Sequence, residues 1–315
     1  MRIFKKKSYN KTEELARLRR CNIRLQIEII FLFLMLLALF LFNYNYTVFK
    51  VLISCGYTDT DALESIYSDT LGERPDGAYL TDFDNAAIAL FTERIREENG
   101  DEFTTLFKRG ELSNEHAVME NDGSRTDFEM IDENTGLFTL TTFSSAAYEN
   151  IKENTEAATA CDNLIFDLRS NPGGTLKYAD KAAEIFLPKG SIISGYVYRS
   201  KLLSKTVTSD NDSPISPKNI YILQDQNTAS AAEVFINSLK ENLPNVTVIG
   251  ETSYGKGVGQ VEMRLLNGFG FKATALEINT PSGNNINHIG ITPDVTTNSE
   301  AAFDMALNLI KSTAD

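Results

Sequence analysis

The sequence predicts an α/β domain with a largely parallel sheet in the second half of the 315-residue chain. Short apolar stretches alternate there with amphipathic ones, which is the pattern of strands and helices in such a domain. The stretch "NLIFDL" (163–168) is almost wholly apolar, as expected for a strand at the centre of the sheet. Hydrophobic residues make up 42% of the chain and charged residues 23%, a composition that argues against disorder.

The front of the chain predicts a membrane anchor. Residues 1–24 carry nine Lys or Arg against two Glu, a net charge of +7. Residues 25–46 are apolar apart from Glu28 and a few polar positions, and about 20 such residues are enough to cross a bilayer. The positive-inside rule places the basic tail in the cytoplasm. We therefore expect a single-pass protein of the cell membrane whose remaining chain is extracytoplasmic.

Two alternatives to an uncleaved anchor are a cleaved signal peptide and a buried core helix. No clear small-x-small cleavage site follows the apolar run, which favours the anchor. "LISC" (52–55) resembles a lipoprotein processing box in which Cys55 is lipidated. However, "NYNYTVFK" (43–50) separates it from the apolar run, and an ordinary juxtamembrane cysteine explains it as well.

Charge and composition exclude several classes of site. Because the whole chain carries −13, residues 25–315 carry −20, and an acidic body of this kind is unsuited to nucleic-acid binding. The three cysteines are scattered, so they indicate neither a disulfide framework nor a zinc site. Only two histidines, His116 and His288, are available for any mechanism that uses histidine.

Residues 56–130 predict a small acidic α+β region. "DNAAIALFTERIREENG" (84–100) has the apolar spacing of a helix that ends at Gly100, and "EFTTLFKRG" (102–110) is typical of a strand that enters a turn.

Residues 131–315 predict the α/β domain itself. The closing segments "GQVEMRLL" and "GFKATALEINT" indicate a hairpin, and 206–218 indicates a flexible loop. The other predicted elements are strands at 136–143, 163–168, 219–223 and 246–250, and helices at 144–160, 176–187 and 230–241.

Two loops at predicted strand ends stand out, since ligands of α/β sheets usually bind there. In "DLRSNPGG" (167–174) the glycines leave backbone N–H groups uncovered, either simply to make a turn or to face a developing oxyanion. Ser230 stands between Ala229 and Ala231 at the start of a helix. It is either an N-cap or a nucleophile whose small neighbours leave its hydroxyl open.

A third loop, "GETSYGKGVGQ" (250–260), nearly matches a phosphate-binding P-loop. That motif requires Ser or Thr after the lysine and then a helix, whereas Gly257 and a strand-like stretch follow Lys256, so a nucleotide triphosphatase is disfavoured. A lysine acts as a general base when it is neutral, which burial favours. In a chain with two histidines, a Ser–Lys dyad is the economical scheme, although a solvated loop lysine is the default for a lysine seen alone.

These loops together resemble a known family. "DLRSNPGG", "NTASAAE" (227–233) and "GETSYGKGVGQ", followed by "TPSGNNINHIGITPDV" (280–295), are similar to the motifs of the C-terminal processing (tail-specific) serine peptidases. The resemblance covers about residues 134–296. It implies a crotonase/ClpP-like core that needs no metal or cofactor.

The resemblance also implies the role of each site residue. Ser230 would be the nucleophile, Lys256 the general base, and Gln260 the residue that positions the lysine. The N–H groups of Gly173 and Ala231 would form the oxyanion hole.

The sequence departs from the family pattern in two places. The family's S-A-S-A-S-E stands here as T-A-S-A-A-E, so Thr228 and Ala232 replace two serines beside the nucleophile. Relatives commonly carry a substrate-capturing PDZ domain before the core, whereas residues 56–130 offer room only for a degenerate, PDZ-like half.

The resulting prediction is a membrane-anchored serine endopeptidase that cleaves partly unfolded or tail-exposed extracytoplasmic proteins. Its partners would be protein or peptide substrates and the membrane, and a homo-oligomer is compatible with the sequence. The alternatives are a non-catalytic, peptide-binding relative and an anchored scaffold whose acidic body docks basic partners.

Overall fold

The computed structural model describes residues 11–42, 96–97, 100–107, 112, 126–264 and 270–314. The chain divides into two compact units, Met1–Lys50 and Val51–Asp315.

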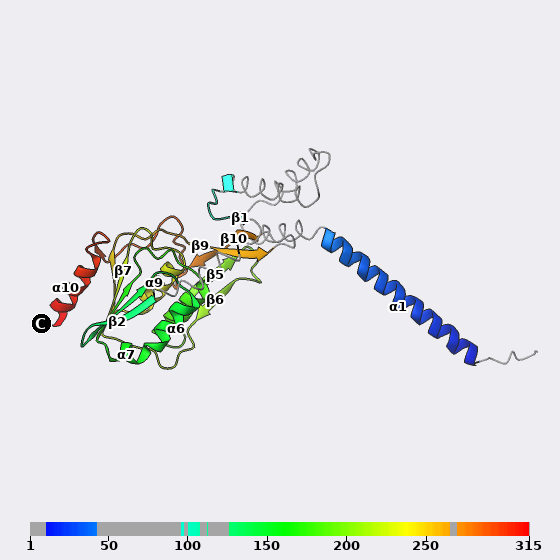
Figure 1. The fold of residues 1–315 in the computed structure, drawn as a ribbon, viewed down its shortest axis with the longest axis horizontal. Coiled ribbons are helices and arrows are strands. Elements are labelled where there is room, and N and C mark those ends of the chain that lie inside the picture. Colours follow the sequence, from blue (N-terminus) through cyan, green and yellow to red (C-terminus); the bar gives the residue numbers. More distant parts are fainter. Residues whose placement is uncertain are drawn as a thin grey trace, which may run out of the picture. The chain divides into compact units, whose positions relative to one another are not determined.

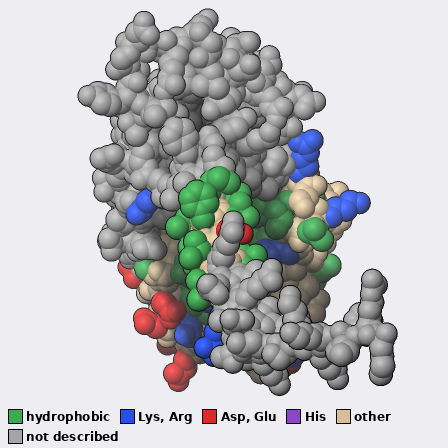
Figure 2. All heavy atoms as spheres, turned by 90° about the vertical axis from the view of Figure 1, so that its right-hand side faces the viewer, with side chains coloured by type: hydrophobic (Ala, Val, Ile, Leu, Met, Phe, Trp, Pro, Cys, Tyr) green, Lys and Arg blue, Asp and Glu red, His purple; other side chains and the backbone are tan. Residues whose placement is uncertain are grey.

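The first unit contains one helix, α1 (Lys11–Phe42). Its described side chains between Ile23 and Leu37 are mostly large and apolar, and each of these is at least 40% exposed. Hydrophobic side chains accordingly form a contiguous group on the face shown in Figure 2. No helix within the described residues combines the length and the apolarity that crossing a membrane requires. The anchor at 25–46 stays a prediction, and Cys55 lies outside the described residues.

Within the described residues, the first strand of the second unit is short and follows two helical residues, Arg96 and Glu97. β1 (Thr105–Phe107) confirms the strand predicted in 102–110, and it pairs antiparallel with β10 (Gly270–Asn279). The predicted helix at 84–100 falls almost wholly outside the described residues. The PDZ-like interpretation of 56–130 therefore stays a prediction.

A six-stranded sheet forms the centre of the second unit, in the order β11-β8-β7-β4-β3-β2 (Figure 1). All neighbours from β3 to β11 are parallel, and only β2 is antiparallel to β3. This confirms the predicted mixed, largely parallel sheet. Its strands are β2 (Thr126–Asp132), β3 (Thr135–Leu140), β4 (Asn163–Asp167), β7 (Asn219–Gln224), β8 (Val246–Gly250) and β11 (Val295–Thr296).

The sheet is covered on both faces because its central strands are apolar throughout. Phe166 belongs to the large core cluster on one face, whereas its neighbour Ile165 packs with Ala302 and Ala306 of α10 on the other. The helices whose residues join the large cluster are α6 (Ser145–Glu153), α7 (Thr155–Ala160), α8 (Leu176–Glu184) and α9 (Ala231–Asn242), and the opposite face is covered by α10 (Ala302–Ala314).

A second sheet follows the order β1-β10-β5-β6, with β9 (Val258–Arg264) also paired to β10. The antiparallel β9 and β10 confirm the predicted hairpin. Side chains of β5 (Ile192–Tyr198) and β10 join the core cluster of α8 and α9, so these helices lie between the two sheets.

Two predicted elements were wrong in detail. The flexible loop at 206–218 begins with a strand, β6 (Lys205–Thr208), because this stretch pairs with β5 along a sheet edge that local sequence does not reveal. The helix at 144–160 is two helices, α6 and α7. Asn154 interrupts it, and its side-chain amide donates to the carbonyl of Asn150 at 2.9 Å.

Candidate active site

Ser230 is the N-cap residue of α9, directly after the loop that follows β7. Its backbone has φ 56° and ψ −116°, a conformation that costs a serine on the order of 1–3 kcal/mol unless the surroundings enforce it. Ala229 and Ala231 are 7% and 0% exposed, so the serine's neighbours are small and packed inward. The hydroxyl is thus presented at a strained turn with no bulky neighbour in sequence.

The surroundings that enforce this turn centre on Glu233, whose side chain is fully buried. Its Oε2 accepts hydrogen bonds from the backbone N–H of Ser230 at 2.8 Å and of Lys256 at 2.9 Å. Its Oε1 accepts from the N–H of Gly255 at 2.7 Å and from the hydroxyl of Ser253 at 2.5 Å. One carboxylate therefore joins the nucleophile loop to the lysine loop.

Burial raises the pKa of Glu233, and the hydrogen bonds from Ser253 and the three backbone N–H groups oppose that rise. Sequence analysis assigned Glu233 no role. A signal was present, because serine followed three positions later by glutamate is the capping-box pattern at a helix start.

The side chains of Ser230 and Lys256 line the same small recess. We call it the serine recess. Much of its wall is apolar, which favours an apolar side chain as its occupant. The apolar side chains are Ile193, Val234, Ile278 and Ile286, and the polar ones besides Ser230 and Lys256 are Ser194, Asn237, Asn279 and Thr280.

Lys256 is half-buried, and its Nζ lies 4.3 Å from the centroid of the Phe103 ring. A cation over a ring face is attracted by the ring quadrupole, so this contact stabilises the ammonium form. The loop that carries the lysine packs closely against the segment before β11. Gly255 has φ +85°, and a Cβ on it would lie 2.7 Å from the backbone nitrogen of Gly290.

Gly173, a candidate oxyanion-hole residue, lies against Ser230. A Cβ on Gly173 would lie 2.9 Å from both the Ser230 Cβ and the Ala231 backbone nitrogen. Ala231 is the first residue of α9, so its N–H has no partner within the helix. The Gly173 N–H, in contrast, donates to Oδ1 of Asn171 at 2.9 Å. It is therefore engaged inside its own turn.

The structure does not place Gln260 in the serine recess. Gln260 lies on β9 and lines a neighbouring recess of about 370 Å³ that shares Ile193 with the serine recess. Its Nε2 is buried and has no hydrogen-bond partner among the described residues.

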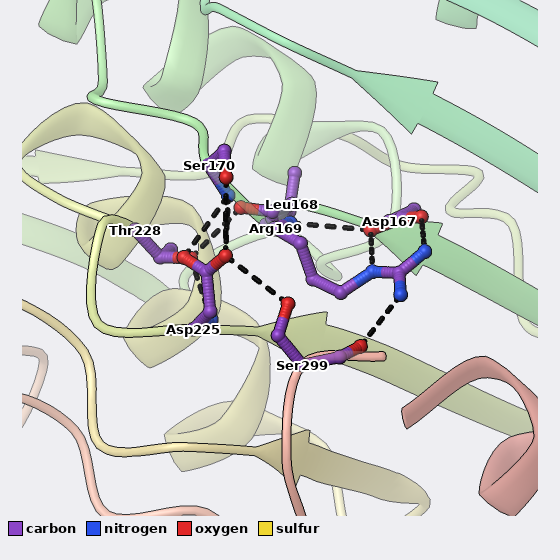
Figure 3. Close-up of polar contacts among 7 residues, drawn as sticks. All are labelled: Asp167, Leu168, Arg169, Ser170, Asp225, Thr228 and Ser299. Atoms are coloured by element: carbon purple, nitrogen blue, oxygen red, sulfur yellow. Dashed lines mark hydrogen bonds and ion pairs between the residues drawn. The ribbon is translucent and has the colours of Figure 1, made fainter. Parts of the chain in front are cut away.

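Asp225 holds the two loops that flank Ser230 together (Figure 3). Both of its carboxylate oxygens accept from the Ser170 N–H at 3.0 Å, and Oδ2 also accepts from the Ser299 hydroxyl at 3.3 Å. Thr228 donates to the Leu168 carbonyl at 2.8 Å and accepts from the Asp225 N–H at 3.0 Å. Threonine thus keeps a hydroxyl that bridges the loops where the family pattern has serine.

Arg169 extends this network toward the C-terminal segment. Its Nε and Nη2 pair with the two carboxylate oxygens of Asp167 at 2.8 and 2.5 Å, and its Nη1 donates to the Ser299 carbonyl at 2.6 Å (Figure 3). A planar pair of this kind fixes orientation as well as charge. The turn that contains Gly173 is therefore braced from the start of α10.

Within the ranges that the structure describes, no group of three His, Cys, Asp or Glu side chains gathers where it could hold a metal ion. His288 lies in the segment that packs on the lysine loop, and its N–H donates to the Gly255 carbonyl at 2.8 Å.

Comparisons with known proteins agree on one family. The model of peptidase family S41 matches residues 134–297, just over half of the chain. The carboxyl-terminal-processing protease of Synechocystis sp. is 30% identical over 161 residues, which are 50% of this chain and 37% of that protein. The carboxy-terminal processing protease CtpA of Bacillus subtilis is 32% identical over 219 residues, 67% of this chain and 45% of that protein. The chain thus spans less than half the length of these relatives.

Among solved structures, a lipoprotein from Streptococcus agalactiae is similar with a TM-score of 0.65. The match covers 86% of this chain and 96% of that one at 18% sequence identity, so it shows the fold alone.

Proposed function

The chain belongs to peptidase family S41, and from that premise we propose that it is a serine endopeptidase of the C-terminal processing kind. The family confirms the resemblance noted in the four sequence motifs. One observation carries the proposal: Ser230 and Lys256 line one recess, and Glu233 binds the backbones of both. The loops that carry Ser230 and Lys256 are thereby held together, which supports the proposed roles of nucleophile and base.

In the proposed mechanism the Ser230 hydroxyl attacks the carbonyl carbon of a peptide bond. Lys256 takes the hydroxyl proton and gives it to the departing amine, which leaves an ester between Ser230 and the acyl part of the substrate. Water attacks the ester with the same lysine as base, and the serine proton returns. Gln260 is proposed to orient the lysine, which requires its side chain to turn from the neighbouring recess toward the serine recess.

The oxyanion formed in each step would be held by backbone N–H groups. Ala231 offers one at the start of α9. The N–H of Gly173 is the proposed second donor. Because it donates to Asn171 in this structure, the turn must rotate when substrate binds.

The substrates are proposed to be partly unfolded or tail-exposed proteins with a small apolar residue beside the cleaved bond. The support is the apolar part of the wall of the serine recess and the small size of that recess. A folded protein offers few extended segments of this kind.

We also propose that residues 25–46 anchor the chain in the cell membrane, with residues 1–24 in the cytoplasm and the peptidase outside it. The support is the apolar composition of 25–46 and the net charge of +7 before it. Residues 56–130 are proposed to be a remnant of a PDZ-like, substrate-capturing region.

The test uses the full-length chain with an unfolded protein substrate, and the products are identified by mass spectrometry. Ser230→Ala and Lys256→Ala should each abolish cleavage. Ser213→Ala and Lys311→Ala change exposed residues of the same types and should leave it unchanged. Cleavage that persists in the Ser230→Ala variant would refute the mechanism.

The alternative is a non-catalytic, peptide-binding relative, and the same protein samples can test it. A fluorophosphonate probe should label Ser230 in the unsubstituted chain. Absence of both labelling and cleavage, with peptide binding retained, would establish the non-catalytic alternative.

A further inference from the structure

A second recess, of about 370 Å³, lies beside the serine recess and shares Ile193 with it. Three lysines line it: Lys177 and Lys181 from α8, and Lys205 from β6. We call it the lysine recess. None of the motifs used to predict the active site includes these lysines.

The three lysines form no ion pair with any described residue, although the chain as a whole is strongly acidic. Lys181 and Lys205 instead lie over aromatic rings, 5.0 Å from the Tyr148 centroid and 5.2 Å from the Tyr196 centroid. Five lysines elsewhere in the second unit do have carboxylate partners, namely Lys152, Lys189, Lys218, Lys240 and Lys272. Three lysines in one recess that form no ion pair indicate an anionic ligand, although the charge of Lys205 also acts on the buried Asp180.

Two carboxylates also line the recess, and both are already engaged. Asp180 is 7% exposed and accepts from the Ser194 hydroxyl at 2.9 Å and the Tyr196 hydroxyl at 2.7 Å. Burial raises the pKa of Asp180, and the hydrogen bonds from Tyr196 and Ser194 together with the charge of Lys205 oppose that rise. Glu184 accepts from the Asp210 N–H at 2.8 Å. Lysines therefore outnumber carboxylates on the wall, and the carboxylates are turned to internal donors.

Gln260 adds a further reason to expect an acceptor here. Its Nε2 is a buried donor without a partner among the described residues, and its side chain lines this recess. An unsatisfied buried donor costs on the order of 1–3 kcal/mol. An acceptor oxygen of a ligand in this recess would relieve that cost, as would the turn toward Lys256 proposed above.

The lysine recess continues the serine recess along the same two strands. Ile193 of β5 and Ile278 of β10 line the serine recess, whereas Tyr198 and Leu276, which face each other across the two strands, line the lysine recess. From Ile193 to Tyr198 an extended chain covers about 17 Å. A peptide bound at Ser230 can thus reach the lysines within about five residues.

We infer that the lysine recess binds a carboxylate of the peptide substrate, a few residues from the bond that Ser230 cleaves. The carboxylate is either the C-terminus of the peptide or an acidic side chain, since both offer the same oxygens to Lys177, Lys181 and Lys205. This inference rests on the proposed peptidase function, because the occupant of the serine recess is what delivers the carboxylate.

The test measures binding without turnover, using the full-length chain with Ser230→Ala. The probe is a short fluorescent peptide of small residues, made in four forms: a free or amidated C-terminus, combined with Glu or Gln near one end. Fluorescence anisotropy gives the dissociation constant of each form. Lys177→Ala, Lys181→Ala and Lys205→Ala are compared singly and together. Lys311→Ala, on the opposite face of the main sheet, is the matched control.

On the chain with all three recess lysines intact, including the Lys311→Ala control, we expect the peptides that bear a carboxylate to bind more tightly than the neutral peptide. Each single substitution should weaken them about threefold and the triple substitution about tenfold or more, with the neutral peptide unaffected. Sensitivity to C-terminal amidation identifies the C-terminus as the ligand, and sensitivity to Glu→Gln identifies the side chain.

Equal binding of all four forms, no measurable binding, or a triple variant that binds like the control would overturn the inference. The peptidase function is tested apart from it, by fluorophosphonate labelling of the chain with Ser230 intact. Labelling of Ser230 without a preference for carboxylate peptides would refute carboxylate binding by the lysine recess and support the peptidase function. Carboxylate binding that depends on the lysines, without labelling of Ser230, would support the binding site and refute the peptidase function.

Discussion

The backbone N–H of Ser230 donates to the Glu233 carboxylate at 2.8 Å, so the candidate nucleophile is held by a side chain from the first turn of its own helix. The same carboxylate oxygen accepts the N–H of Lys256 at 2.9 Å. Because one group determines two positions, its loss should disturb the relation between nucleophile and base rather than either alone.

Glu233→Gln should lower kcat about 10- to 100-fold, because the amide cannot accept all four hydrogen bonds at once and leaves buried donors unpaired. The loss of unfolding free energy should be about 1–3 kcal/mol, measured by denaturant titration. Glu300→Gln, at an exposed position, should change neither quantity. An unchanged kcat for Glu233→Gln would show that the dyad does not depend on this carboxylate.

Gly173→Ala should abolish cleavage. The new Cβ would lie 2.8 Å from the Ala229 carbonyl oxygen and 2.9 Å from the Ala231 nitrogen, so the oxyanion region and the nucleophile turn must separate. Gly190→Ala is the matched control, since Gly190 also has a positive φ but nothing lies within 4 Å of its Cβ position. Both variants should lose about 1–3 kcal/mol of stability from backbone strain, and only Gly173→Ala should lose fluorophosphonate labelling.

Phe103→Leu should move the rising limb of kcat/KM against pH toward lower pH by a few tenths of a unit. The Phe103 ring favours the charged form of Lys256, the form that cannot act as a base, by about 0.5–1 kcal/mol. Without the ring the lysine loses its proton more readily. Phe107→Leu, in β1, removes a ring that has no such contact with Lys256 among the described residues. A limb that moves toward higher pH, or equally in both variants, would contradict this account.

The α/β core was predictable from sequence because its strands are nearly pure apolar runs. The observed ends of β4 and β7 agree with the predicted ends to within about one residue. Such apolar runs are stable as strands at the centre of a sheet that is covered on both faces. β6 was not predictable. Its four residues, Lys205–Thr208, are exposed or half-buried and become a strand only through pairing with β5.

The candidate site was predictable only as far as its motifs reach. Ser230, Lys256, Gly173 and Ala231 were named from sequence. In the structure Ser230 and Lys256 line one recess, and Gly173 lies against Ser230 and Ala231. Glu233 escaped notice because a buried glutamate looks, in sequence, like an ordinary helix residue. The present place of Gln260 in the lysine recess also has no sequence signal, since it depends on a side-chain orientation.

Asp225→Asn should destabilise the fold in a pH-dependent way. Burial alone would raise the pKa of Asp225, but hydrogen bonds from Ser170, Asn227 and Ser299 outweigh it and hold the pKa below its usual value. A lowered pKa in the folded state gives stability that is present above the unfolded pKa of about 3.9 and is lost as pH falls through the folded pKa. The free energy of unfolding of the variant should therefore be about 1–3 kcal/mol lower than that of the unsubstituted chain at pH 7, and this deficit should become smaller in acid. Thermal unfolding from pH 7 down to about pH 3 measures this, with Glu133→Gln as the exposed control. A deficit that stays constant across this range would assign the loss to packing and not to the charge on Asp225.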